Sequence, residues 1–249
     1  MPMEETTVSK EAADIVGLTV QGFPSMVACA RHVVSEIRSG RGGAAFAINA
    51  EKVVSYSEDA RLRRLLEQAT LRYPDGAGVV LAMRRRGIAT ARIPGVELWL
   101  AILREATSRQ IQVALIGARA EVLRQVQEKL TAEFPNVRTV LALDGFEGVR
   151  DLVAVKAAVA ETEPDLVFVA MGTPRQEQLI AELRQHYGRA YYLGLGGSFD
   201  VYCGLKRRAP AWMQRIGLEW FFRFLIEPTR AAREKKRLQF LWMLTRGTV

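Results

Sequence analysis

The sequence predicts an α/β fold in which a mostly parallel sheet is flanked by helices. Short continuous apolar runs, typical of strands buried on both faces, alternate along the chain with helix-length segments that are apolar on one side. No internal repeat or low-complexity segment interrupts this alternation. At 249 residues, 49% of them hydrophobic, the chain suits one Rossmann-like domain with a smaller appendage.

Five apolar runs of five to eight residues are predicted to be strands. They are residues 44–49 (AAFAIN), 111–117 (IQVALIG), 137–143 (VRTVLAL), 165–172 (DLVFVAMG) and 191–195 (YYLGL). Residues 71–73 are a sixth, shorter candidate, because the turn formers Pro74, Asp75 and Gly76 follow them.

The segments between these runs are predicted to be helices. In residues 58–69, Leu62, Leu65, Leu66 and Ala69 fall on one side of a helix. A proline at its start supports a helix at residues 94–107. The remaining predicted helices are residues 79–86, 121–134, 152–161 and 175–187.

The last 44 residues carry the whole charge imbalance. Residues 1–205 hold 24 basic and 24 acidic residues, whereas residues 206–249 hold 11 basic and three acidic ones, which gives the net charge of +8. Three of the four tryptophans, Trp212, Trp220 and Trp242, lie in the same segment. We therefore predict an α/β domain at residues 1–205 and a basic, aromatic, helical appendage at residues 206–249.

A cationic and aromatic helical segment is suited to docking on a membrane face, although nucleic acid is a rival partner for a basic segment. A solvated basic helix with a core-packing stripe of Leu238, Leu241 and Trp242 has the same pattern. Arginines of such a segment could also bind a diphosphate, because guanidinium groups match phosphate oxygens.

Compartment signals favour the cytoplasm. Cys29 and Cys203 make no C-x-x-C pair, as expected for thiols in a reducing compartment, and the acidic N-terminus does not resemble a signal peptide. No apolar run reaches the roughly 18 residues of a spanning helix. We expect a cytoplasmic protein whose membrane contact is peripheral.

Polar and glycine-rich segments follow the predicted strands, at the edge where open α/β sheets bind ligands. Glycine turns leading into helices leave backbone N–H groups that can hold a phosphate, although an ordinary strand-to-helix turn has the same sequence. The candidate substrate-binding residues in these segments are Asn49, Lys52, Gly76, Gly78, Gly117, Gly172, Arg175, Gln176, Glu177, Gly197 and Asp200.

Asp75 is the candidate catalytic residue. In its Pro-Asp-Gly-x-Gly turn it could act as a general base, or serve only as a turn former or helix cap. Gln176 could hydrogen-bond a sugar or base, whereas Glu177 could simply complement a helix dipole.

The sequence lacks the motifs of several common enzyme classes. There is no G-x-G-x-x-G after the first strand, no P-loop and no G-x-S-x-G elbow, so nicotinamide, ATP and serine-hydrolase chemistry are unsupported. No D-x-D motif is present, and the two cysteines and two histidines have no metal-ligand spacing. We expect no metal and no cofactor.

A series of ordered segments carries a family resemblance. They are residues 48–52 (INAEK), 74–80 (PDGAGVV), 95–98 (GVEL), 171–177 (MGTPRQE), 196–200 (GGSFD), 206–210 (KRRAP), 217–220 (GLEW) and 227–230 (EPTR). Together they resemble the bacterial glycosyltransferases of the WecG/TagA/CpsF family (glycosyltransferase family 26), from about residue 47 to residue 233.

The resemblance implies an inverting, metal-independent transfer from a UDP-sugar to an undecaprenyl-diphosphate-linked sugar at the cytoplasmic membrane face. It implies that Asp75 is the base and that tail arginines hold the diphosphate; the matching residues are Arg208, Arg215, Arg223 and Arg230. Ala47 stands where the teichoic acid branch has a threonine, so that role is not carried over.

Residues 49–52 look more like the branch that transfers N-acetylmannosaminuronic acid to lipid-linked GlcNAc in enterobacterial common antigen synthesis. A uronate needs a cation, and Lys52 or Arg175 could supply it. UDP-N-acetylmannosamine or UDP-glucose as donor, or a non-catalytic nucleotide-sugar-binding module, are the alternatives. Nucleic acid is not expected as a partner, and a homo-oligomer is compatible with the sequence.

Overall fold

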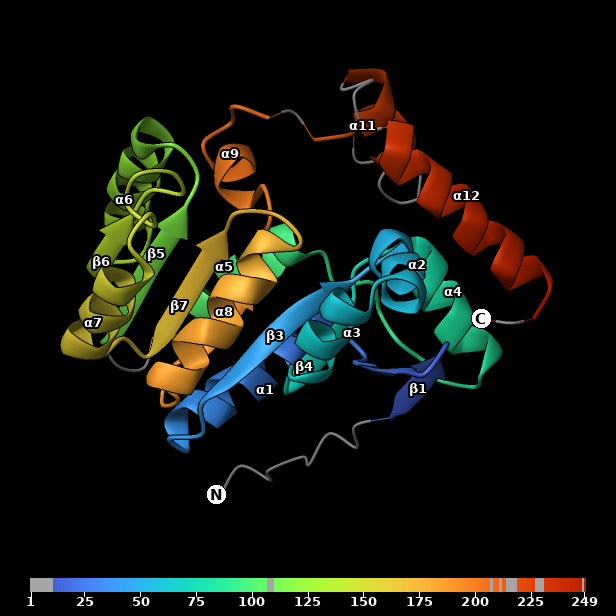
Figure 1. The fold of residues 1–249 in the computed structure, drawn as a ribbon, viewed down its shortest axis with the longest axis horizontal. Helices are drawn as coiled ribbons and strands as arrows, with labels where there is room; N and C mark the ends of the chain where they lie inside the picture. The colour runs from blue at the N-terminus through green and yellow to red at the C-terminus, as the bar shows by residue number, and fades with distance from the viewer. Residues whose placement is uncertain are drawn as a thin grey trace.

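The computed structural model describes residues 11–106, 110–206, 208–210, 212–213, 219–226, 231–247 and 249. In this part of the chain a six-stranded sheet has the order β4-β3-β8-β7-β5-β6, with every pairing parallel (Figure 1). The strands are β3 (Gly43–Ile48), β4 (Leu71–Pro74), β5 (Ile111–Gly117), β6 (Val137–Leu143), β7 (Leu166–Ala170) and β8 (Tyr191–Gly194). The predicted α/β fold with a parallel sheet is confirmed, and residues 71–73 do belong to a strand.

Helices cover both faces of the sheet, which explains why the strands are apolar throughout. In β3, Phe46 and Ile48 pack in one core, whereas Ala45 and Ala47 pack in the other. The first core is closed by α2 (Ala50–Glu58), α3 (Ala60–Glu67), α4 (Ala77–Arg85), α7 (Leu152–Thr162) and α8 (Arg175–His186). The second is closed by α1 (Met26–Arg38), α5 (Gly95–Glu105), α6 (Ala120–Glu133) and α9 (Ser198–Tyr202).

The helix predicted at residues 58–69 is confirmed as α3, whereas α2, which directly precedes it, was not assigned from the sequence. Asp59 ends α2 and caps α3, since its carboxylate accepts hydrogen bonds from the backbone N–H groups of Arg61 and Leu62. The polar residues that follow β3 are therefore the first turn of α2, whose cap is Asn49.

An antiparallel hairpin of β1 (Ala12–Ile15) and β2 (Leu18–Gln21) precedes α1, and it was not assigned from the sequence. Its strands have four residues each, and both turn residues, Val16 and Gly17, have positive φ. Valine rarely adopts that conformation, so the turn lacks the usual hairpin signal. Gln21 ties the hairpin to the sheet by accepting a hydrogen bond from the Arg72 N–H.

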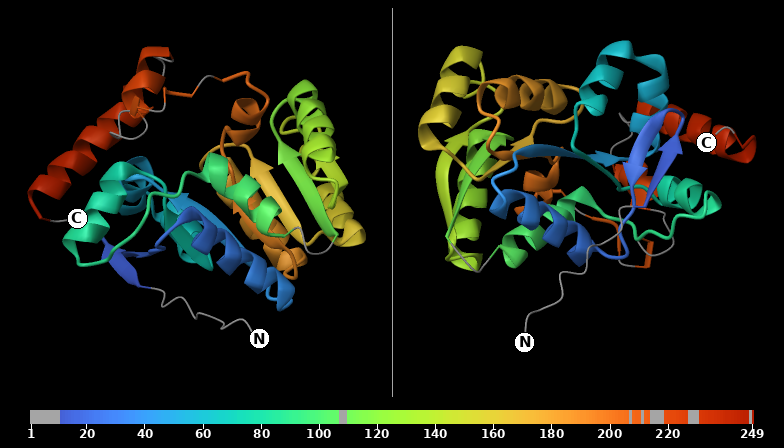
Figure 2. Two further views of the ribbon diagram at one scale, coloured as in Figure 1. Left: turned by 180° about the vertical axis from the view of Figure 1, so that it is seen from behind. Right: turned by 90° about the horizontal axis from the view of Figure 1, so that it is seen from below.

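The C-terminal segment contains α11 (Glu219–Ile226) and α12 (Ala231–Thr245). Helix α12 lies against α2 and α4, as Figures 1 and 2 show from opposite sides. Phe240 and Leu244 are buried there, and Lys236 donates to the hydroxyl of Ser55. No helix in the described part of the chain is long and apolar enough to cross a membrane.

Candidate active site

Four chain segments leave the sheet together at its carboxyl edge. They follow β3 at Asn49, β4 at Asp75, β7 at Met171 and β8 at Leu195. The chain runs from β3 outward to β4, whereas β8 lies on the other side of β3, so the strand order reverses direction there. Open α/β sheets bind ligands in the crevice at such a reversal.

Asp75 lies directly after β4 and before the first turn of α4. Its backbone N–H donates to the carbonyl of Ile48 (2.9 Å), which extends the pairing of the two strands by one residue. Gly76, the N-cap of α4, packs beside Asn49, since an added Cβ would lie 3.5 Å from the Asn49 Cα. The half-buried Asp75 carboxylate therefore belongs to the edge of the crevice, close to the start of α2.

Asn49 caps α2. Its Oδ1 atom accepts a hydrogen bond from the Lys52 N–H (3.0 Å), so this atom is committed to the helix. Contact between Asn49 and a substrate stays a prediction, and its amide nitrogen is the donor that could make it.

A buried ion pair lies beneath the crevice. Lys52 Nζ lies 2.9 Å from Glu177 Oε1, and the two side chains are 7% and 0% exposed. Burial by itself would raise the pKa of Glu177, but the charge of Lys52 and hydrogen bonds from Lys52 and Gln176 lower it below its usual value. Thr173 also donates to Glu177 Oε1 (3.1 Å). The pair therefore joins α2 to the first turn of α8, and Thr173 adds the loop after β7 to this contact.

Gln176 connects two loops at the carboxyl edge. Its Oε1 atom accepts from the N–H of Gly172 (3.2 Å) and of Gly196 (2.8 Å), while its Nε2 atom donates to Glu177 (2.9 Å). Gln176 is only 3% exposed. These contacts assign Gln176 and Glu177 to holding the loops in place, and direct ligand contact by either side chain is unsupported by them.

Two of the candidate glycines have a packing reason for being glycine. At Gly117, φ is +118° and an added Cβ would lie 2.4 Å from the carbonyl oxygen of Ala170 on β7. At Gly78, an added Cβ would lie 2.9 Å from the ring of Phe240 on α12. The second glycine of the Asp-Gly-x-Gly turn thus allows close packing of α12 against α4.

The loop after β8 brings a cation to the edge. Gly197 is the N-cap of α9, and the carbonyl of Asp200 accepts hydrogen bonds from the N–H groups of Leu205 and Lys206. The Lys206 ammonium lies 4.0 Å from the position of a Cβ added at Gly197. Lys206 was not among the candidate residues selected from the sequence, although its place as the first basic residue of the tail was a usable signal.

Arg175 and Phe146 lie at the carboxyl edge of the other half of the sheet, which contains β7, β5 and β6. Arg175 donates to the carbonyl of Gly145 (3.1 Å), and the neighbouring Phe146 side chain is 61% exposed. An aromatic ring this exposed beside a ligand edge is a candidate for base stacking. Phe146 was not selected from the sequence, although the Asp-Gly-Phe turn directly after the predicted strand at residues 137–143 was a usable signal.

The tail is tied to the α/β body by ion pairs near the start of α5. Arg208 Nη1 lies 2.7 Å from Glu97 and Arg208 Nε lies 3.9 Å from Glu219, which also pairs with Arg92. Arg208 is therefore placed close to the body of the protein. Arg215, Arg230 and the side chain of Arg223 lie outside the described residues.

Among the described residues, no group of three or more His, Cys, Asp or Glu side chains could hold a metal ion. The polar groups that the structure places along the edge are a carboxylate at Asp75, cations at Arg175 and Lys206, and backbone N–H groups in the loops after β7 and β8.

Many different nucleotide-dependent enzymes bind their ligands at the carboxyl edge of a parallel sheet, so the fold by itself gives only a broad class of protein. Comparison with known families narrows the class, since residues 13–249 match the model described as "Glycosyl transferase WecG/TagA/CpsF family". The protein is a glycosyltransferase. The chain belongs to the WecG/TagA/CpsF family, and the match extends through α11 and α12.

Proposed function

We propose that this glycosyltransferase moves N-acetylmannosaminuronic acid, with inversion and without a metal ion, from a UDP-sugar to an undecaprenyl-diphosphate-linked GlcNAc. The observation that carries the proposal is the position of Asp75. It is an acidic residue that follows β4 at the carboxyl edge, one strand away from the reversal between β3 and β8, and it lies within the residues 13–249 that match the family. The product would be a β-linked disaccharide lipid for a cell-surface polysaccharide.

In the proposed step the Asp75 carboxylate takes the proton of the acceptor hydroxyl. The hydroxyl oxygen then forms a bond to the anomeric carbon, the bond from that carbon to the UDP oxygen breaks, and the negative charge passes to UDP. A positioned general base contributes roughly 10²–10⁴-fold to such a reaction. Departure of UDP requires positive charge or N–H groups near its β-phosphate.

For the UDP group, support comes from the loops that Gln176 holds together. The turns at Gly172 and Gly196 have positive φ, and open space surrounds the Cβ position of each, so backbone can approach a phosphate closely. Lys206 would supply positive charge, and Phe146 would stack on the uracil ring. Arg208 and the other tail arginines would complete the diphosphate site.

For the uronate carboxylate, Arg175 is the better of the two cations. The charge of Lys52 is compensated by buried Glu177, whereas Arg175 is exposed at the edge. A guanidinium can bind a carboxylate through two hydrogen bonds. UDP-N-acetylmannosamine and UDP-glucose remain the alternative donors.

For the membrane, we propose that residues 206–249 are the docking appendage of a catalytic domain at residues 1–205, on the inner face of the cell membrane. Trp212 and Trp242 are 60% and 54% exposed, in a segment with 11 basic and three acidic residues. Each basic residue near an anionic surface contributes about 1 kcal/mol, so binding to vesicles with phosphatidylglycerol should weaken strongly at high salt. Tighter binding to duplex DNA than to such vesicles would contradict this partner.

The experiment that tests the reaction offers a panel of UDP-sugars together with a synthetic prenyl-diphosphate GlcNAc, with products identified by mass spectrometry. We expect transfer from UDP-N-acetylmannosaminuronic acid that persists after dialysis against EDTA. Tight UDP-sugar binding without transfer to any acceptor would favour the non-catalytic module. Activity that EDTA abolishes and Mg²⁺ restores would contradict the metal-free mechanism.

A further inference from the structure

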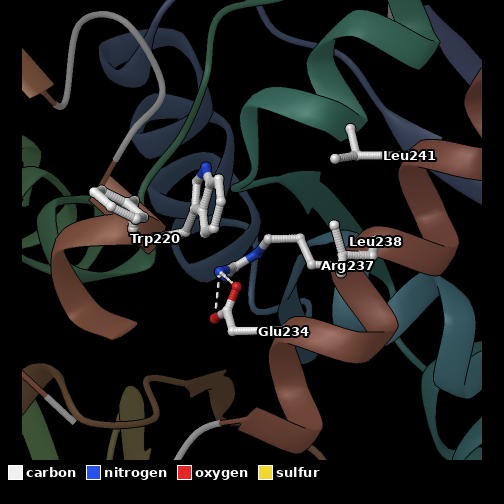
Figure 3. Close-up of a pocket in the computed structure, with 6 residues that line it drawn as sticks. Trp220, Glu234, Arg237, Leu238 and Leu241 are labelled. Atoms are coloured by element: carbon white, nitrogen blue, oxygen red, sulfur yellow. Dashed lines mark hydrogen bonds and ion pairs between the residues drawn. The ribbon is translucent and has the colours of Figure 1, made fainter. Parts of the chain in front are cut away.

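A groove lies between α11 and α12. Its volume is about 260 Å³, and its accessible walls are apolar. Figure 3 shows the aromatic ring of Trp220 facing two leucines and an arginine across the groove. The lining residues are Trp220, Phe221, Glu234, Arg237, Leu238 and Leu241.

The charged residues of the lining neutralise each other. Arg237 Nη1 bonds both carboxylate oxygens of Glu234, at 2.7 and 2.9 Å, and the guanidinium lies 5.5 Å from the centroid of the Trp220 ring (Figure 3). The positive charge of Arg237 is thus compensated within the protein, by the Glu234 carboxylate and the Trp220 ring. The groove is suited to an apolar occupant and unsuited to a nucleotide or a free phosphate.

The two helices that form the groove are anchored to the body of the protein. Phe240, one residue before Leu241, packs on Gly78, which is three residues after Asp75. Glu219, one residue before Trp220, forms an ion pair with Arg92 on the body of the protein. Both helices that form the groove are therefore anchored beside the edge that holds Asp75.

The outer side of the groove is open to solvent through apolar side chains. Leu238 is 64% exposed, Leu241 is 43% exposed and Phe221 is 41% exposed. Exposed apolar surface of this kind marks interaction sites. The surrounding segment is basic, which complements an anionic headgroup next to an apolar chain.

We propose that this groove binds the isoprenoid chain of the acceptor lipid, at the units next to its diphosphate. The inference rests on the proposed lipid-linked acceptor. That acceptor has a sugar to be placed at Asp75, a diphosphate for the basic residues, and a chain that must pass from the site to the membrane. The groove lies between those two places and shields the chain from water on the way.

A matched pair of leucines provides the test. Leu238 lines the groove, whereas Leu225 on α11 has a similar exposure (59%) and is absent from the lining. The variants Leu238→Gln and Leu225→Gln are compared with the wild-type full chain in lipid-free buffer. Calorimetry measures binding of farnesyl diphosphate and of inorganic diphosphate, and thermal melting checks that each variant is folded.

The wild type should bind farnesyl diphosphate at least tenfold more tightly than inorganic diphosphate. Leu238→Gln should lose most of this preference, because one wall becomes polar, while Leu225→Gln should retain it. Equal binding of the two probes by the wild type, or equal losses in the two variants, would overturn the inference. Equal losses in the two variants are also what we expect if lipid chains bind over the whole tail and not in the groove.

Two further readouts separate the explanations. If Leu238→Gln alters the sedimentation coefficient and leaves farnesyl diphosphate binding unchanged, a second copy of the chain occupies the groove and the inference is wrong. If transfer to the lipid-linked sugar fails while the farnesyl preference and its loss in Leu238→Gln are observed, the groove is confirmed as an isoprenoid site and the proposed reaction is wrong.

Discussion

The ammonium of Lys52 lies 2.9 Å from the carboxylate of Glu177, and both side chains are buried beneath the carboxyl edge of the sheet. Lys52 belongs to the first turn of α2 and Glu177 to the first turn of α8. The pair thus holds together the two helix starts that flank β3 and β7. Through Gln176, which donates to the same carboxylate, it also fixes the loops at Gly172 and Gly196.

Breaking this pair should destabilise the protein. Lys52→Met leaves Glu177 as an uncompensated buried charge, which costs about 3–5 kcal/mol of unfolding free energy. Replacing both residues, as Lys52→Met with Glu177→Leu, should recover part of that loss because no charge then remains buried. Urea denaturation at pH 7 measures these differences. A Lys52→Met variant within about 0.5 kcal/mol of wild type would show that the pair does not hold the loops.

The same pair should make stability depend on pH. The pKa of Glu177 is lowered from its ordinary value of 4.5. Its contribution is therefore fully present above pH 4.5 and is lost as the pH falls through the lowered pKa. The matched control is Glu182, a half-exposed carboxylate of α8 that pairs with Lys156 at the surface. Glu177→Gln should reduce the acid sensitivity of urea denaturation below pH 4.5, whereas Glu182→Gln should leave it nearly unchanged.

The layered fold followed from local patterns. Strands such as β5 and β7 are apolar because both faces of the sheet are covered, and this pattern is visible in the sequence alone. Helix α2 was missed because the polar residues after β3 were interpreted as a ligand-binding segment, whereas the cap at Asn49 that starts the helix is a matter of side-chain geometry. The hairpin was missed because Val16 occupies a position of positive φ that it rarely adopts.

Only part of the candidate site could be predicted from the sequence. The position of Asp75 after a strand could be predicted, because strand ends are local features of the sequence. The pairing of Lys52 with Glu177 could not, since the contact depends on β3 and β7 both lying beside β8. Packing of Phe240 on Gly78 was hidden for the same reason, and substrate contact at Gly78 stays a prediction.

Gly78→Ala should weaken docking of the tail. The added methyl group would lie 2.9 Å from the buried Phe240 ring, and such overpacking costs about 1–3 kcal/mol. Gly76→Ala is the matched control in the same turn, because its methyl group would make ordinary contacts at 3.5 Å. Limited proteolysis should cut the α12 region faster in Gly78→Ala only. Phe240→Leu combined with Gly78→Ala should restore protection, and equal cleavage of the two alanine variants would refute the packing role.

Asp75→Asn should abolish most turnover and leave the fold intact. The amide cannot accept a proton as a base, so kcat should fall by about 10²–10⁴-fold. UDP-sugar binding and the melting temperature should change little, because Asp75 is half-buried and its backbone bond to Ile48 is retained. Initial rates and calorimetric binding of the UDP-sugar measure the two effects. Near-wild-type turnover in the folded variant would remove Asp75 as the base.

Arg175→Gln should reduce the preference for the uronate donor. Arg175 lies at the start of α8 and reaches Gly145 on the loop after β6, so its guanidinium stands at the edge where the donor sugar is proposed to bind. A hydrogen bond to a charged group contributes about 1.5–3 kcal/mol. Loss of that bond should therefore reduce kcat/KM for the uronate by roughly tenfold or more, and much less for the uncharged parent sugar.

A competition assay between UDP-N-acetylmannosaminuronic acid and UDP-N-acetylmannosamine measures this preference directly. Arg184→Gln serves as the control, since Arg184 lies in the last turn of the same helix and donates to Gln68, away from the carboxyl edge. We expect the control to keep the wild-type preference. If the wild type transfers the uncharged sugar at least as well, and Arg175→Gln leaves the ratio unchanged, the uronate assignment is wrong. The membership in a glycosyltransferase family would be unaffected, because it depends on the whole of residues 13–249 and not on one cation.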